Sequence, residues 1–276
     1  MEPTLSILRS PRTRTVISVL LLVYLTGALA LYFFQEPLIF RAKVLPPAHR
    51  FDERLSHREI FIPVNTQDTL HAVLYLPNGK KAKGLVLYFH GNRQNIGWYE
   101  KFVPYFTEQG YEVLMPDYPG YGKSKGTLNE DKLYAWATLV YQVARKRYAA
   151  DSLIIYGKSI GTGIATQLAS RRDCRELILE TPYYRFSDVM QRFLPIYPMA
   201  LLLRYELPTY RYLPLVAAPV TLLHGTQDGI VPFAQSQKLS TLFKPQDRLV
   251  VIENGSHNDL YRFSKTTQWL SQKLQN

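Results

Sequence analysis

The sequence of 276 residues contains a single cysteine, Cys174, and none of the short motifs that hold zinc or nucleotides. One cysteine cannot form a disulfide within the chain, and a thiolate metal cluster is not expected from it. The patterns CxxC and HExxH and the phosphate-binding P-loop do not occur. The sequence therefore predicts chemistry that needs no metal and no other cofactor.

Acidic residues are also scarce, because 22 Asp and Glu accompany 33 Lys and Arg and leave a formal charge of +11. The basic residues are scattered, and they form no stripe with aromatic residues of the kind that binds nucleic acids. We expect no nucleic-acid partner, and attraction to an anionic membrane surface explains the charge better. Internal repeats and low-complexity tracts are absent, and nothing in the sequence indicates the oligomeric state.

Residues 15–34, TVISVLLLVYLTGALALYFF, carry no charged side chain. About 20 apolar residues at a rise of about 1.5 Å cross a hydrocarbon core of about 30 Å, whereas a buried core helix is normally shorter and amphipathic. The basic N-terminal segment 1–14 precedes this stretch, and the aromatic residues 32–34 end it as an interfacial belt would. We predict a transmembrane signal anchor at 15–34, followed by a connector at 35–50.

A cleaved signal peptide is the alternative, because Ala28-Leu29-Ala30 has the A-x-A form that signal peptidase reads. The apolar stretch continues past that site and exceeds a typical signal-peptide core, which favours an uncleaved anchor. Arginines precede the stretch, but Arg41 and Lys43 follow it, so the positive-inside bias is weak. We expect the N-terminus in the cytoplasm and the main domain on the non-cytoplasmic side.

Residues 51–276 alternate short β-like runs with longer helical stretches. Strands are predicted at 59–64, 69–77, 84–90, 111–117, 153–157, 176–180, 219–225 and 248–254. Helices are predicted up to Gly110, at 130–148, 160–170 and 233–243, and up to about Leu274. The first two strands should be antiparallel, and the rest predict one α/β domain with a mainly parallel sheet covered by helices on both faces. An aromatic insertion at 181–215 interrupts the pattern.

Residues 157–161, GKSIG, place Ser159 between two glycines directly after the predicted strand 153–157. The pattern G-x-S-x-G alone is a weak signal, because a chain of this length matches it by chance about one time in ten. Here it joins a buried strand to a helix, which is the context of a nucleophile elbow. Glycine permits the tight turn, and the helix N-terminus favours negative charge. We therefore predict a nucleophilic Ser159 rather than a flexible linker.

A serine nucleophile needs a base, which a third group orients. Asp228 in TLLHGTQDGIVP and His257 in VVIENGSHND both follow predicted strands, at the carboxyl ends where the sites of open α/β sheets collect. The order Ser159, Asp228, His257 is that of an α/β-hydrolase triad. The structural alternative for Asp228 is an aspartate that caps a turn, and for His257 a histidine in a loop without a catalytic role. Glu180, at the end of another predicted strand, is the rival to Asp228 as the triad acid.

These residues resemble those of an α/β-hydrolase, in particular the small, N-terminally anchored serine hydrolases often described as lysophospholipase-like or serine-aminopeptidase-like. The matching motifs are HGN (90–92), PDYPGYGKSKG (116–126), GKSIGTG (157–163), HGTQDGIVP (224–232) and GSHND (255–259). The resemblance implies the α/β-hydrolase fold and the triad, and it says less about the substrate.

The resemblance also implies an oxyanion hole built from two backbone N–H groups, one after the strand at 84–90 and one from the residue after the nucleophile. By position these donors are Asn92 and Ile160, with Arg93 as the alternative to Asn92. His90 and His224 precede glycines at strand ends, and we expect structural roles for them.

The insertion at 181–215 would then form a cap over the nucleophile. Its tyrosines, phenylalanines and leucines suit an acyl pocket, unless they only pack the cap onto the domain. Its four arginines suit a phosphate or carboxylate group: Arg185, Arg192, Arg204 and Arg211. We expect hydrolysis of a lipid-like ester or thioester through an acyl-serine. The alternatives are a serine aminopeptidase-like amidase and a non-catalytic binding protein of the same fold.

Overall fold

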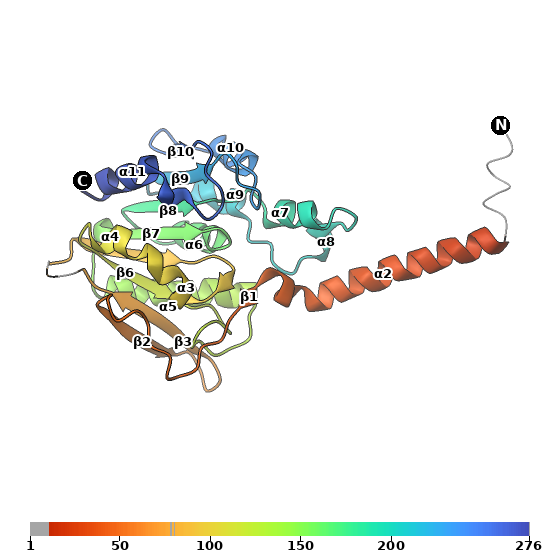
Figure 1. Ribbon diagram of the computed structural model, residues 1–276, viewed down its shortest axis with the longest axis horizontal. Coiled ribbons are helices and arrows are strands. Elements are labelled where there is room, and N and C mark those ends of the chain that lie inside the picture. The colour runs from red at the N-terminus through yellow and green to blue at the C-terminus, as the bar shows by residue number, and fades with distance from the viewer. Residues whose placement is uncertain (1–10, 78, 80, 276) are drawn as a thin grey trace.

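The computed structural model describes residues 11–77, 79 and 81–275. A long helix, α2 (Pro11–Ile39), projects from a rounded α/β domain (Figure 1). Most of the predicted basic segment 1–14 lies outside the described residues, and its last four residues belong to the first turn of α2.

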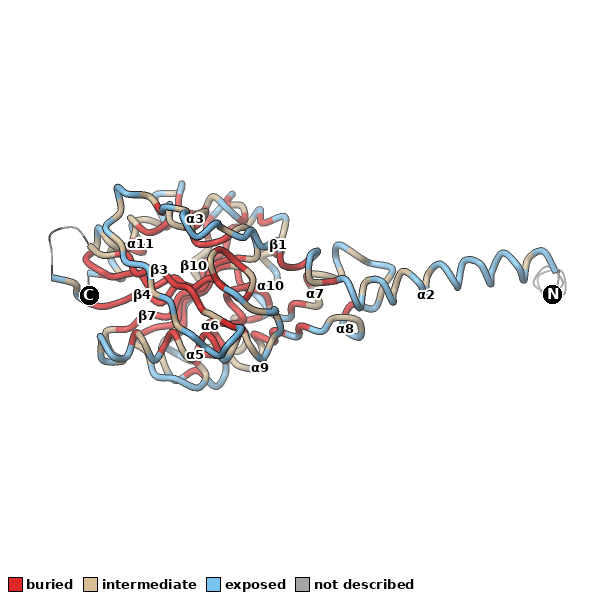
Figure 2. Tube along the Cα trace, turned by 90° about the horizontal axis from the view of Figure 1, so that it is seen from below, coloured by how far each residue is buried: buried red, intermediate tan, exposed pale blue. Residues whose placement is uncertain are grey.

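Helix α2 extends beyond the predicted anchor at both ends, so the first five residues of the predicted connector are helical. The helix is kinked at Phe34, where φ is −111° and ψ is 23°. Pro37 explains the kink, because proline lacks an N–H and its ring clashes with the carbonyl four residues earlier. The most apolar 18 residues of α2 have a mean hydropathy of 2.3, and none of them is buried. By length and composition α2 can cross a membrane, and it is not a core helix of the domain (Figure 2).

The domain is built on an eight-stranded sheet of order β10-β9-β8-β7-β4-β6-β3-β2. Its strands are β2 (His57–Pro63), β3 (Thr69–Tyr75), β4 (Gly84–Phe89), β6 (Tyr111–Pro116), β7 (Leu153–Lys158), β8 (Glu176–Glu180), β9 (Val220–Gly225) and β10 (Arg248–Ile252). Strand β3 is antiparallel to both β2 and β6, and all other neighbours are parallel. The prediction of an α/β domain with a mainly parallel sheet is confirmed.

Helices cover both faces of the sheet. Successive side chains of a strand point to opposite sides, and in strands such as β4 and β7 all of them are buried, so both faces need cover. One face packs on α5 (Glu130–Arg145), α6 (Gly161–Ala169) and α10 (Ala234–Ser240). The other packs on α3 (Ile96–Tyr99), α4 (Pro104–Thr107) and α11 (Ser264–Gln275).

The single helix predicted before Gly110 consists of two short helices, α3 and α4, joined by a 3₁₀ turn. Pro104 begins the second of them, and its missing N–H prevents one continuous helix.

The local sequence sets the ends of α5. The side chain of Asn129 accepts a hydrogen bond from the N–H of Lys132 at 2.8 Å and caps the helix. Glu130 and Asp131 lie in the first turn and Arg145 in the last, which suits the helix dipole at both ends.

Two further features lie beside Ser159, which follows the carboxyl end of β7. The first is a two-stranded parallel ladder of β1 (Arg41–Ala42) and β5 (Arg93–Gln94), which the sequence did not predict. The second is the insertion 181–215, which contains α7 (Phe186–Phe193), α8 (Met199–Leu202) and α9 (Thr209–Tyr212). Helices α7 and α8 lie on the side of the domain from which α2 projects (Figures 1 and 2).

Candidate active site

The turn between β7 and α6 holds Ser159 in the left-handed backbone region, with φ at +52°. A non-glycine residue rarely adopts this conformation, and it is a mark of functional turns. The turn is tight: a Cβ added to Gly157 would lie 2.6 Å from the carbonyl oxygen of Gly161, and one added to Gly161 would lie 2.2 Å from that of Phe89. The two glycines of the GKSIG motif are therefore needed for close approach of the backbone.

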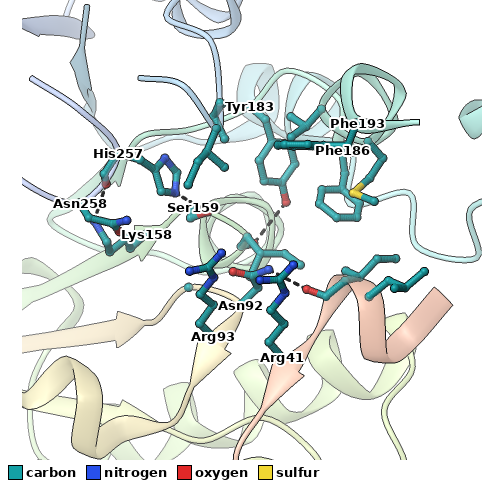
Figure 3. Close-up of a pocket in the computed structure, with 18 of the residues that line it drawn as sticks. Arg41, Asn92, Arg93, Lys158, Ser159, Tyr183, Phe186, Phe193, His257 and Asn258 are labelled. Atoms are coloured by element: carbon teal, nitrogen blue, oxygen red, sulfur yellow. Dashed lines mark hydrogen bonds between the residues drawn. The ribbon is translucent and has the colours of Figure 1, made fainter. Parts of the chain in front are cut away.

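Ser159, His257 and Asp228 form a continuous chain of hydrogen bonds. His257 Nε2 lies 3.0 Å from Ser159 Oγ (Figure 3). On the other side of the ring, His257 Nδ1 lies 2.7 Å from Asp228 Oδ2. A carboxylate can only accept, so Nδ1 carries the ring proton and donates a hydrogen bond to Asp228, while Nε2 accepts a hydrogen bond from the serine hydroxyl. The structure thus brings the three sequence-predicted residues together from the ends of β7, β9 and β10.

The carboxylate of Asp228 is held by several donors. Its Oδ1 accepts the backbone N–H groups of Ile230 and Val231, each at 2.8 Å. Burial raises the pKa of Asp228, but hydrogen bonds from His224 and His257 outweigh burial and leave that pKa below its usual value. Asp228 is therefore ionised at neutral pH.

His224 braces the same loop, in line with the structural role expected of it. Its Nε2 lies 2.9 Å from the carbonyl oxygen of Val231 and 3.2 Å from Asp228 Oδ2, and its Nδ1 lies 2.6 Å from Ser236 Oγ. His90 is likewise buried, between the rings of Tyr99 and Tyr118.

The rival acid, Glu180, lies beneath the site with other partners. It forms a buried ion pair with Lys158 and accepts a hydrogen bond from the hydroxyl of Tyr156 at 2.7 Å. Lys158 in turn donates to the backbone carbonyl of His257 at 3.2 Å. Glu180 therefore supports the histidine loop through Lys158 and makes no hydrogen bond to the imidazole ring among those described.

Asn92 and Ile160 both border the cavity that contains Ser159. Within the described residues, neither backbone N–H has a hydrogen-bond acceptor, as an oxyanion donor requires. The N–H of Arg93, the alternative first donor, has no acceptor among the described hydrogen bonds either, so Asn92 remains the donor that sequence position predicts.

The cavity has a volume of about 370 Å³ and two chemically different sides. Its apolar side is lined by Leu38 and Ile39 of α2 and by residues of the cap, among them Phe186, Met190 and Phe193. Its polar side carries three cations: Arg41, Arg93 and Lys158. No Asp or Glu lines the cavity in the part of the chain that the structure describes.

The four cap arginines do not form the expected cationic rim, because none of them lines this cavity. Arg204 pairs with Glu36 at 2.7 Å and Arg211 with Glu206 at 3.0 Å. Arg41 and Arg93 lie there instead. The sequence placed Arg93 near the site only as the alternative oxyanion donor and did not place Arg41 there, since the pairing of β1 with β5 joins segments 52 residues apart.

Comparison with known proteins agrees with the fold. A family model described as serine aminopeptidase, S33, matches residues 80–212. The uncharacterized protein YfhR of Escherichia coli (strain K12) is 29% identical over 182 residues, which are 64% of this chain and 63% of YfhR. The α/β hydrolase domain-containing protein 17C of Mus musculus is 26% identical over 238 residues, 82% of this chain and 72% of that protein. Together with the fold, these findings support a member of the α/β-hydrolase superfamily.

Solved structures show the same fold for this α/β-hydrolase. The Pyrococcus furiosus esterase Pf2001 superposes with a TM-score of 0.66 at 18% identity, over 86% of this chain and 97% of the esterase. The acylaminoacyl peptidase of Pyrococcus horikoshii superposes with a TM-score of 0.59 at 16% identity, over 80% of this chain and 40% of the peptidase. At these identities the likeness concerns the fold alone. The family model and the curated relatives support a hydrolase.

Proposed function

We propose that this α/β-hydrolase is a membrane-anchored serine hydrolase that cleaves a lipid-like ester or thioester through an acyl-serine intermediate. The observation that carries the proposal is the hydrogen-bond chain from Asp228 through His257 to Ser159, which ends in a largely apolar cavity of about 370 Å³. Pockets that hold acyl groups are lined mostly by apolar and aromatic side chains. No metal or cofactor enters the proposed reaction.

In the first half-reaction, Ser159 Oγ attacks the carbonyl carbon while His257 Nε2 takes the hydroxyl proton. Asp228 stabilises the imidazolium, and the N–H groups of Asn92 and Ile160 donate hydrogen bonds to the oxyanion. Collapse breaks the bond to the alcohol or thiol, which leaves with the proton from His257. In the second half-reaction, His257 takes a proton from water while the water oxygen attacks the acyl carbon. The bond from that carbon to Ser159 Oγ then breaks, which frees the carboxylic acid, and His257 returns the proton to Oγ.

The charge of the cavity argues against the amidase alternative. An aminopeptidase has to hold a free ammonium group beside the scissile bond, and an acidic side chain is the usual partner for a buried cation. Among the described residues, those that line the cavity include cations and no acid. The cavity therefore suits a neutral or anionic substrate.

Membrane attachment through α2 fits the same substrate class. The apolar wall of the cavity includes Leu38 and Ile39, the last residues of α2. A second apolar hollow, bordered by Leu31, Phe34 and Leu38 on one side and by Leu194 and Tyr197 of the cap on the other, continues along α2. An acyl chain that leaves the bilayer along α2 would therefore meet apolar surface up to Ser159.

Fluorophosphonate labelling of the full-length protein in detergent tests the proposed nucleophile. We expect labelling of the wild type and none of Ser159→Ala. The matched control is Ser170→Ala, which removes a hydroxyl at the other end of α6. Labelling that survives Ser159→Ala would refute the assignment, and a wild type that does not label would favour the non-catalytic binding protein.

A chain-length series of p-nitrophenyl esters, run beside aminoacyl-naphthylamides, tests the substrate class. We expect kcat/KM to rise from acetyl to medium-chain acyl groups, because longer chains bury more apolar surface, at about 0.8 kcal/mol per CH₂. A preference for the aminoacyl amides would replace the esterase with the amidase.

A further inference from the structure

Arg41 and Arg93 lie directly opposite each other in the β1–β5 ladder. Strand β1 begins two residues after α2 ends, and β5 begins directly after Asn92. The N–H of Arg41 donates to the carbonyl of Asn92 at 3.0 Å, and the N–H of Lys43 donates to that of Gln94 at 3.1 Å. The ladder thus fixes a residue from the end of the membrane helix beside the proposed oxyanion hole.

Both guanidinium groups border the cavity that contains Ser159 (Figure 3). Like charges placed directly opposite on neighbouring strands destabilise a sheet, so this pair is unfavourable for folding by itself. In the part of the chain that the structure describes, neither side chain forms an ion pair or a side-chain hydrogen bond, whereas several other arginines bind carboxylates. Because the cavity also lacks acidic residues, the positive charge of this pair is not neutralised from within the cavity.

We propose that Arg41 and Arg93 bind a phosphate on the leaving group of the substrate. The inference rests on the proposed function and adds the substrate's charged half to it. The acyl chain lies against the apolar side formed by α2 and α7, its carbonyl lies at Ser159, and the leaving group extends to the arginines. Guanidinium groups match phosphate oxygens in pairs of parallel hydrogen bonds, and two of them together match a doubly charged phosphate.

The position of the pair relative to α2 fits a phosphate that comes from a lipid headgroup. Arg41 follows the last residue of the membrane helix by two positions. A side chain at that level lies near the phosphates of the lipid headgroups on the side of the membrane that carries the domain. A phosphorylated soluble ester would offer the same chemistry without the bilayer, so the test includes both.

The test compares substrates that differ only in the phosphate: an acylglycerol and the matching acylglycerol phosphate, each with a butyryl and a dodecanoyl chain. The readout is the ratio of kcat/KM for the phosphorylated over the neutral substrate, measured with full-length protein in neutral detergent. We expect the ratio to be about ten to a hundred in the wild type and near one in Arg41→Gln/Arg93→Gln. We expect a smaller loss in Arg41→Lys/Arg93→Lys, which keeps the charge but not the planar fork.

A matched control is Arg58→Gln/Arg172→Gln, which removes two exposed arginines outside the cavity and should leave the ratio unchanged. The preference should also decrease with salt, because the pair is exposed. A high ratio with both chain lengths indicates a phosphate site as such, and a high ratio with dodecanoyl alone indicates a lipid headgroup. A wild-type ratio near one, or the same ratio in wild type and Arg41→Gln/Arg93→Gln, would overturn the proposal.

Fluorophosphonate labelling separates this failure from that of the proposed function. A wild type that labels at Ser159 but shows no phosphate preference would refute only the arginine site. A wild type that does not label would refute the serine hydrolase itself.

Discussion

The ion pair of Lys158 and Glu180 gives a sharp test of how the active site is supported. Both residues are 1% exposed, and the pair is joined to Tyr156 and to the backbone of His257. Replacing one partner leaves an uncompensated buried charge, which costs about 3–5 kcal/mol. For a domain of this size, about 2–4 °C of melting temperature corresponds to each kcal/mol. We therefore expect Lys158→Met and Glu180→Met each to lower Tm by about 6–20 °C.

The double variant Lys158→Met/Glu180→Met should lose less stability than the sum of the single variants, because no charge is left buried. Thermal unfolding of the full-length protein in detergent micelles measures all three. Single losses below about 1 kcal/mol, or losses that add, would show that the pair is not coupled as the structure indicates.

Substitution of Asp228 and of Glu180 distinguishes the two candidate acids of the triad. Asp228→Asn should lower kcat by about three to four orders of magnitude, since the imidazole loses the carboxylate that sets its tautomer. The folded fraction of Glu180→Gln should keep kcat within about tenfold, because Glu180 acts only through Lys158 on the histidine loop. A reversed order of effects would make Glu180 the triad acid.

Three further predictions follow from the burial of Cys174, the pKa of Asp228 and the apolar sequence of α2. Burial raises the pKa of Cys174 to about 12, so this thiol should react slowly with Ellman's reagent at about pH 8 in the folded protein and quickly after unfolding; fast reaction without unfolding would contradict it. The pKa of Asp228 is lower in the folded than in the unfolded state, so its contribution to stability is present above about pH 4 and lost as the pH falls through the folded value. The Tm difference between wild type and Asp228→Asn should therefore shrink on acidification, and a constant difference would contradict the shift. Full-length protein should stay in membranes after a carbonate wash, whereas a soluble mature chain that begins at Leu31 would indicate cleavage of the signal.

The sheet and the triad follow from local sequence because their signals are local. Buried strands such as β4 and β7 are continuous apolar runs, and the glycines of GKSIG mark a turn that only glycine can form. Asp228 and His257 could be placed because parallel strands bring their carboxyl ends to one edge. Their hydrogen bonds required the structure.

The cavity lining depends on contacts that no local pattern encodes. Strands β1 and β5 have two residues each, too few to show a period, and their pairing decides that Arg41 and Arg93 border the cavity. The arginines of the insertion suggested a cationic rim around the cavity. Arg204 pairs instead with Glu36, 168 residues away in the sequence, and lies outside the cavity. The charge of a pocket therefore had to be determined from the fold.

The last residues of α2 should contribute to substrate selection as well as to anchoring. Gln35 donates a hydrogen bond to the carbonyl of Leu202 at 3.1 Å and accepts one from the N–H of Arg204 at 2.9 Å, which ties this end of α2 to the cap. Ile39, which is 2% exposed, also forms part of the cavity wall.

Two truncated chains separate these roles: residues 31–276 keep the last turns of α2, and residues 41–276 remove them. The shorter chain loses the wall at Ile39 and the contacts of Gln35 with the cap, and one buried aliphatic side chain contributes about 1.5–3 kcal/mol. We expect its kcat/KM for medium-chain esters to fall about tenfold or more relative to the longer chain, with a smaller change for acetyl esters. Equal chain-length profiles would mean that α2 is only a tether, and a fall of the same size for both esters would mean that the truncation damages the triad rather than the acyl pocket.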